Sequence, residues 1–195
     1  MILSNQGIKQ ALKVGEIPIE PPPEEDQYTT SAVDLFIGSD FRCWDHARLK
    51  IKGLKQILNL AEQSFQITAT AYLKELALEK DGTFIFPPYT TESMHVLGIS
   101  RERVNLKLGS RIAARVEGRS SLARLGLLVH LTAPTIHAGF AGNITLEMIN
   151  HGPFYLQIVP NKTRICQLIF ERLESSPEGE ISTAFQGQTK PTGTR

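Results

Sequence analysis

The segment Gly118–Arg124, with the sequence GRSSLAR, concentrates phosphate-binding groups in a short stretch. Its arginines and adjacent serines donate hydrogen bonds to phosphate oxygens, and its glycine lets backbone N–H groups approach an anion closely. Glu147 follows in ITLEMIN, where it alternates with Ile144, Leu146 and Met148 and therefore faces the other way from these apolar residues. A partly desolvated carboxylate on such a strand is suited to proton transfer. The two segments together indicate an enzyme that acts on a nucleotide.

The runs that surround these residues resemble a known family. GRSSLARLGLLVHLTA, ITLEMINHGP and RICQLIFERL are similar to the dCTP deaminase branch of the dUTPase superfamily. The similarity is dense from Val104 to Leu173 and weaker in SAVDLFIGSDFR and in FQGQTKPTGTR, near the two ends. The resemblance implies hydrolytic deamination of dCTP to dUTP and ammonia by a homotrimer. It also implies that no cofactor is required for the chemistry, and that Mg²⁺ is bound through the triphosphate.

The resemblance implies a role for each matching residue. Glu147 would take a proton from the water that attacks C4 of cytosine and would then protonate the departing ammonia. Arg119, Ser120 and Ser121 would hold phosphate. Arg124 would also hold phosphate and would orient Glu147 across a subunit boundary. The other implied substrate-binding residues are Thr132, Ala133, His137, Phe140, Gln186 and Gln188. Without the family context, the same phenylalanine is more typical of a core and the Thr-Ala pair of an ordinary turn.

The chain departs from the family pattern in the sugar site and in the tail. His137 stands where the family usually has an aspartate that accepts a hydrogen bond from the sugar 3′-hydroxyl. A neutral histidine can accept that bond, but the carboxylate charge is lost. Ala184 and Phe185 stand where the family usually has lysine and tyrosine. We therefore expect weaker triphosphate binding than in other members.

Two other functions fit the same residues. The first is pyrophosphate release from dUTP, alone or after deamination, although the missing aspartate at His137 weighs against a plain dUTP pyrophosphatase. The second is a low-turnover, nucleotide-binding trimer with a regulatory role, which is compatible with the altered tail. The combination of GRSSLAR with Glu147 favours an enzyme, because a pure binder has little use for a proton-transfer carboxylate.

Bulk composition excludes several other classes. With 195 residues, 21 basic and 20 acidic side chains and a net charge of +1, the chain has the size of one domain and no charge bias toward nucleic acids or membranes. Cys43 and Cys166 are too few for a disulfide framework or a structural zinc site. The N-terminus lacks the pattern of a signal peptide, and no apolar run approaches the roughly 18 residues of a membrane span. We therefore expect a cytoplasmic protein.

The elements that must position these residues are mostly short strands separated by glycine and proline. This pattern predicts a mainly β, dUTPase-like distorted β-barrel or jelly roll with a few short helices. One domain would cover residues 1–173, and a flexible tail, residues 174–195, would close over the active site. Ser4 should cap an N-terminal helix that ends at Gly15, while the prolines in residues 17–31 should prevent regular structure.

The remaining segments are assigned by their apolar periodicity. Residues 54–63 have a helical period, whereas residues 65–73 have the β-branched and aromatic content of a strand. The other predicted strands are Val33–Ile37, Phe84–Pro88, Leu106–Leu108, Ile112–Val116, Leu125–Leu131, Ile144–Ile149, Tyr155–Val159 and Arg164–Leu173.

Overall fold

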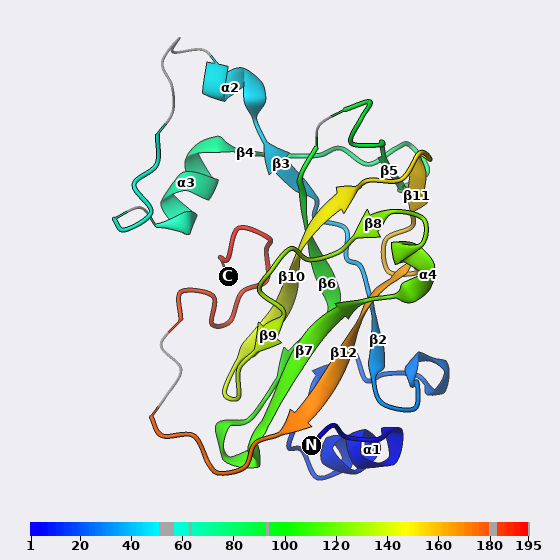
Figure 1. Ribbon diagram of the computed structural model, residues 1–195, viewed down its shortest axis with the longest axis vertical. Helices are drawn as coiled ribbons and strands as arrows, with labels where there is room; N and C mark the ends of the chain where they lie inside the picture. Colours follow the sequence, from blue (N-terminus) through cyan, green and yellow to red (C-terminus); the bar gives the residue numbers. More distant parts are fainter. Residues whose placement is uncertain (51–56, 63, 93, 180–182, 195) are drawn as a thin grey trace.

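The computed structural model describes residues 1–50, 57–62, 64–92, 94–179 and 183–194, most of which belong to short strands and their connections (Figure 1). The strands are β1 (Ile19–Glu20), β2 (Val33–Phe36), β3 (Arg42–Trp44), β4 (Leu73–Glu75), β5 (Phe84–Phe86), β6 (Val96–Asn105), β7 (Ile112–Gly118), β8 (Leu127–Leu128), β9 (Thr135–Ile136), β10 (Ala141–Asn150), β11 (Leu156–Ile158) and β12 (Arg164–Arg172). The mainly β class is confirmed.

The strands of the described residues form three sheets. The largest has the order β4-β3-β6-β10-β8, with β1 also pairing with β6. The second has the order β2-β12-β7-β9, and β5 pairs with β11 in the third. In the described part of the chain these sheets do not close into one barrel, so the architecture is a set of packed open sheets.

The helical elements are short: α1 (Asn5–Lys13), η1 (Glu25–Gln27), α2 (His46–Lys50), α3 (Phe65–Tyr72), η2 (Leu108–Ser110) and α4 (Ser120–Ala123). The predicted N-terminal helix is confirmed, because Ser4 Oγ accepts a hydrogen bond from the Gly7 N–H at 3.3 Å and Gly15 takes φ +71° after the helix. No helix within the described ranges has both the length and the apolar character needed to cross a bilayer.

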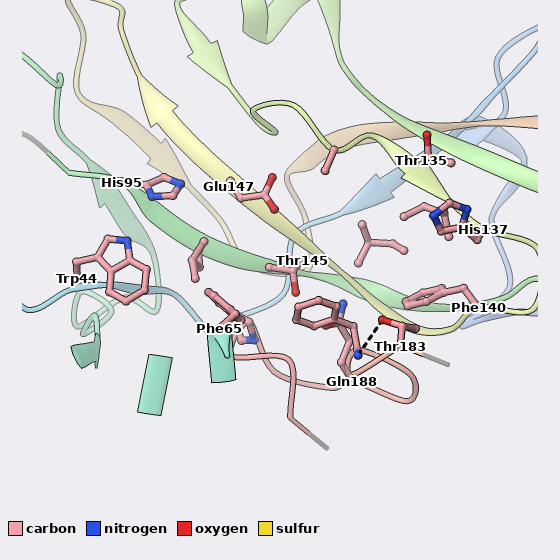
Figure 2. Close-up of a pocket in the computed structure, with 16 residues that line it drawn as sticks. Trp44, Phe65, His95, Thr135, His137, Phe140, Thr145, Glu147, Thr183 and Gln188 are labelled. Atoms are coloured by element: carbon pink, nitrogen blue, oxygen red, sulfur yellow. Dashed lines mark hydrogen bonds between the residues drawn. The ribbon is translucent and has the colours of Figure 1, made fainter. Parts of the chain in front are cut away.

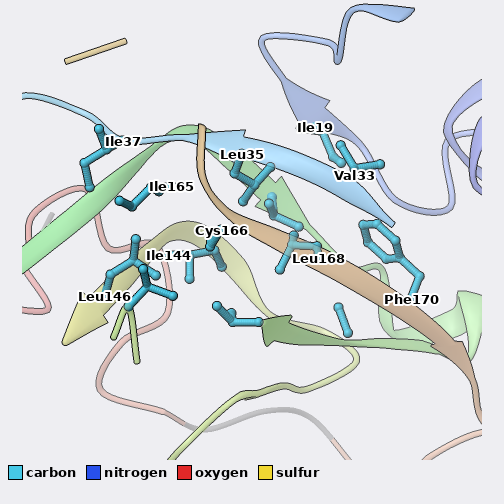
Figure 3. Close-up of a cluster of buried hydrophobic side chains, with 14 of the residues drawn as sticks. Ile19, Val33, Leu35, Ile37, Ile144, Leu146, Ile165, Cys166, Leu168 and Phe170 are labelled. Carbon is cyan, nitrogen blue, oxygen red and sulfur yellow. The ribbon is translucent and has the colours of Figure 1, made fainter. Parts of the chain in front are cut away.

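The main core lies between β2 and β12 on one side and β10 on the other (Figure 3). Ile144, Leu146 and Met148 point into it and are at most 2% exposed. Burial of each such side chain contributes about 1.5–3 kcal/mol. Thr145 and Glu147 alternate with them and are only partly buried. The predicted two-residue alternation is therefore confirmed, and it turns Glu147 away from the core.

The strand prediction for residues 65–73 is wrong over most of its length, because Phe65–Tyr72 is the helix α3. The Thr68 hydroxyl donates to the Ser64 carbonyl at 3.2 Å, and Ala69 is buried against Leu97. This packing overrides the weak strand preference of the β-branched residues. Residues 57–62 are irregular, and the rest of the helix predicted over residues 54–63 lies outside the described residues.

The sequence pattern also missed most of β6. The charged residues 101–103 belong to this strand, and Glu102 among them is fully buried. The Glu102 carboxylate accepts hydrogen bonds from Arg101 at 2.6 Å and from the Phe36 N–H at 2.9 Å, and burial raises the pKa of this carboxyl group. A buried charge is thus tolerated because it has partners within hydrogen-bond distance.

Several strand boundaries also differ from the prediction. The strand predicted over Leu106–Leu108 is wrong, since β6 ends at Asn105 and η2 begins at Leu108. Only Leu127 and Leu128 of the strand predicted over Leu125–Leu131 are paired, and β9 was not predicted. Residues 17–31 include the short elements β1 and η1 despite their prolines. The formation of such two-residue strands depends on pairing with a neighbouring strand rather than on a local sequence pattern.

Candidate active site

A cavity of about 430 Å³ lies over the outer face of β10 and β6 (Figure 2). The turn before β10 and the C-terminal tail complete its walls. Its size is that of an ordinary small-molecule site. Most of its lining is apolar or aromatic, and its polar side chains are His95, Thr135, His137, Thr145, Glu147, Thr183 and Gln188. Such a lining suits a planar heterocycle that is oriented by a few polar contacts.

Glu147 enters this cavity because of its register in the largest sheet. It lies opposite Leu97 of β6, and Thr145 lies opposite Ile99. Directly opposed residues in an antiparallel pair share a face. Glu147, Thr145 and Leu97 therefore belong to one wall of the cavity, and Figure 2 shows the carboxylate projecting from β10 into it.

The C-terminal tail packs along the beginning of β10. Asn143 N–H donates to the Gln188 carbonyl at 3.0 Å, and Gln188 Nε2 donates to the Asn143 carbonyl at 2.8 Å. Gln186 Nε2 donates to the Gly139 carbonyl at 3.0 Å. Gly142 permits this approach, because a Cβ atom there would lie 3.2 Å from the backbone N and O of Gln188. Gln186 and Gln188 thus hold this part of the tail against the start of β10.

An aromatic wall joins the tail to α3. The Phe185 ring lies 5.9 Å from that of Phe65, which in turn meets Trp44 edge-on at 6.5 Å. Gln66 Nε2 donates to the Ala184 carbonyl at 3.3 Å. Sequence reasoning did not identify Trp44 or Phe65 as site residues. Their neighbourhood depends on a contact between segments far apart in the chain, for which no local signal exists.

His95 and Thr145 are two further polar residues of the cavity that sequence reasoning missed. Within the part of the chain that the structure describes, His95 Nε2 and Thr145 Oγ1 are buried and lack a hydrogen-bond partner. Burial lowers the pKa of His95, and the negative charge of Glu147 partly opposes that shift. The alternation along β10 could have identified Thr145, since it precedes Glu147 by two residues on the same face.

The segment Gly118–Arg124 runs from the end of β7 through α4. Arg119 Nε lies 3.2 Å from Oδ2 of the buried Asp34, and its Nη1 donates to the Arg164 carbonyl at 3.4 Å. Burial raises the pKa of Asp34, while the Arg119 charge opposes the increase. A guanidinium has five N–H donors, so these contacts orient Arg119 and still leave donors for an anion.

Comparison with known proteins identifies the family. A family model described as dCTP deaminase-like matches residues 2–173. The chain belongs to this family. It is 37% identical to "dCTP deaminase, dUMP-forming" of Methanosphaera stadtmanae, over 97% of this chain and 91% of that protein. It is 35% identical to the dCTP deaminase of Rhodospirillum rubrum, over 100% of this chain and 96% of that protein. The resemblance inferred from the sequence is confirmed.

A solved structure shares the fold of this dCTP deaminase-like chain. The crystal structure of 2′-deoxycytidine 5′-triphosphate deaminase from Agrobacterium tumefaciens matches with a TM-score of 0.62 and 18% identity. The match covers 87% of this chain and 47% of that one, so the present chain spans about half the length of the Agrobacterium protein. At this identity the likeness shows the fold alone.

The predicted site residues of this family member fall into two groups. Those that line the cavity are Ala133, His137, Phe140, Glu147 and Gln188, and Gln186 anchors the tail beside it. Those outside its lining are Arg119, Ser120, Ser121, Arg124 and Thr132. In Figure 1, α4 lies on the right, whereas the tail that borders the cavity lies on the left. Phe140 contributes to both the main core and the cavity wall.

Metal-binding side chains do not cluster in the described residues, where no group of three or more His, Cys, Asp and Glu could hold an ion. Cys43 in β3 and Cys166 in β12 are free and buried, and burial raises the pKa of both thiols. Burial keeps these thiols in their neutral form, which is a poor nucleophile and metal ligand.

Proposed function

We propose that this protein hydrolytically deaminates dCTP, with Glu147 as the group that transfers protons. The observation that carries the proposal is the projection of Glu147 from β10 into a mostly apolar cavity, in a chain of the dCTP deaminase-like family. The cytosine ring would lie against the apolar and aromatic walls, which exclude bulk water from the reacting atoms.

The proposed reaction balances with one water molecule. As the water oxygen bonds to C4, Glu147 accepts a proton and passes it to N3 of the ring. Glu147 then accepts the proton of the new C4 hydroxyl group and passes it to the amino nitrogen as the C4–N bond breaks. The products are a uracil nucleotide and ammonia, and Glu147 returns to its starting state.

Binding of the substrate's phosphates requires basic residues from outside this cavity. The cavity lining contains no Arg or Lys among the described residues. We propose that Arg119, Ser120, Ser121 and Arg124 reach the phosphates from a second copy of the chain. Mg²⁺ would be bound through the triphosphate, since Glu147 is the one carboxylate in the described lining.

The proposed assembly is a homotrimer with active sites at its subunit boundaries. Three apolar residues in the segment after Arg124 are each 39–44% exposed: Leu125, Leu128 and Leu131. Contact with a second copy would remove them from water, with a gain of about 25 cal/mol for each Å² buried. The same contact would bring Arg124 to the neighbouring cavity.

Subunit mixing should reveal shared sites. Glu147→Gln and Arg124→Ala are each expected to be inactive alone, whereas mixed oligomers of the two should regain deamination, because some sites would combine both unaltered residues. Light scattering should give three times the 21.6 kDa chain mass. A monomer mass at assay concentration, or no recovery in oligomers verified to be mixed, would contradict the shared site.

The product defines a second candidate function. The sequence prediction named dUTP, whereas the relatives from M. stadtmanae and Coprothermobacter proteolyticus are both named dUMP-forming. These names support a bifunctional reaction in which pyrophosphate is also released. His137, in place of the family aspartate, argues against that second step.

Product analysis separates these candidates. The purified protein is incubated separately with dCTP, dCMP and dUTP, and ammonia, pyrophosphate and nucleotides are measured. We expect ammonia from dCTP. Pyrophosphate released in step with ammonia would assign the bifunctional reaction, whereas accumulating dUTP would restrict the enzyme to deamination. Binding of dCTP without ammonia release would instead support the nucleotide-binding role.

A further inference from the structure

The register of β6 against β10 places His95 beside Glu147. Glu147 pairs with Leu97 and Met148 with Val96, the first residue of β6. His95 directly precedes β6 and is two residues from Leu97, so it lies on the same side as Leu97. Both side chains line the cavity, and Figure 2 shows His95 and Glu147 on neighbouring parts of its wall. Trp44 of β3 flanks His95 and also lines the cavity.

The imidazole of His95 has an unused hydrogen-bonding atom at this position. Its Nε2 is buried and has no partner among the described residues. Buried polar side-chain atoms in native proteins usually have a partner. Catalytic hydrogen bonds are often long without substrate and shorten when it binds. Among the described residues that line the cavity with His95, Glu147 supplies the one carboxylate that can accept such a bond.

We propose that His95 is a positioning residue that donates a hydrogen bond from its neutral imidazole to the Glu147 carboxylate in the complex with substrate. The inference rests on the proposed deamination and adds a residue to it. The bond would orient the carboxylate toward the attacking water. His95 gains and loses no proton during turnover, so the proton balance through Glu147 is unchanged.

Burial of His95 favours a neutral imidazole near pH 7, although the charge of Glu147 opposes this effect. Glu147 faces it from the cavity, while a second cleft of about 330 Å³ borders its other side. The ionisable side chains of that cleft are Cys43, His46, Lys50, Lys74 and Glu92. Burial lowers the pKa of His95 from 6.5, so its protonation requires more acid than that of a free histidine. An imidazolium formed there would stabilise the charged carboxylate and make it a weaker base.

Kinetics test the positioning role. His95→Phe should lower kcat for dCTP by about ten- to hundredfold, the usual effect of losing a hydrogen bond to a charged group, with KM nearly unchanged. His95→Gln retains an N–H donor and should recover most of the loss. In a plot of log kcat against pH, the acid side of the His95→Gln profile should fall with a slope near one. The wild-type profile should fall there with a slope near two. His46→Gln is the matched control, because His46 borders the second cleft but not the Glu147 cavity.

The opposite outcomes overturn the inference. Wild-type kcat in folded His95→Phe, or a loss of kcat in His95→Gln as large as that in His95→Phe, would show that His95 does not act by donating a hydrogen bond to Glu147. An effect of His95→Phe that appears as an increase in KM instead of a fall in kcat would do the same. If the Phe variant fails to fold, the Gln variant still tests the acid limb. A wild-type protein that does not deaminate dCTP would instead refute the proposed function.

Titration by NMR tests the pair without turnover. The Glu147 charge raises the pKa of His95, so Glu147→Gln should lower the pKa of the His95 imidazole further. The resonances of His46 and His151 serve as internal references, because neither residue lines the cavity. An unchanged His95 titration in the Gln variant would separate the two side chains and overturn the inference.

Discussion

Replacement of Glu147 by glutamine is expected to lower the rate of dCTP deamination by about 10²–10⁴-fold, the usual contribution of a general acid–base group. Glutamine keeps the size of the side chain but cannot accept the proton of water. The expected loss is therefore in kcat. Binding of dCTP, measured by calorimetry, should persist because the walls of the cavity are unchanged.

Glu117→Gln is the matched control for this substitution. Glu117 is also a partly buried strand glutamate, but it lies in β7, where it pairs with Arg115 at 3.9 Å, and it does not line the cavity. Its kcat should stay within a few-fold of the wild-type value. A folded Glu147→Gln protein with similar activity would remove Glu147 from the mechanism.

Introduction of lysine at position 184 is expected to strengthen dCTP binding. Ala184 is exposed between Thr183 and Phe185, both of which line the cavity, so a longer side chain can be accommodated. A charge-assisted contact to phosphate is worth about 1.5–3 kcal/mol. Ala184→Lys should therefore lower KM by roughly ten- to hundredfold. Its kcat should change little if ground and transition states bind the phosphates equally.

Thr189→Lys controls for a charge placed elsewhere on the tail. Thr189 is exposed and does not line the cavity, so this variant adds the same charge without the same position. We expect its KM to remain close to the wild-type value. Equal KM values for Ala184→Lys and the wild type would show that the family alignment of the tail is wrong.

Local rules predicted the parts of the protein whose cause lies within a few residues. The cap at Ser4 and the glycine after α1 follow from hydrogen bonding and backbone freedom over one helical turn. The outward direction of Glu147 follows from the two-residue repeat of β10. These features need no knowledge of the neighbouring strands.

Other features depend on residues that are distant in the sequence. Phe65–Tyr72 is helical because its buried face packs against β6, and this contact outweighs its strand-like composition. Phe185 belongs to the cavity because its ring meets Phe65. Asp34 is buried in β2, and its carboxylate pairs with Arg119, which lies far along the chain.

The sequence by itself determined the family, the mainly β class, and the residue types that supply anion binding and proton transfer. These follow from side-chain chemistry and short-range periodicity, which are properties of the chain alone. Only the tertiary structure decided which residues surround Glu147. The register of β6 against β10 brings His95 alongside it, although about 50 positions separate the two residues. Such a register is selected by long-range hydrogen bonding and core packing, and no local pattern encodes it.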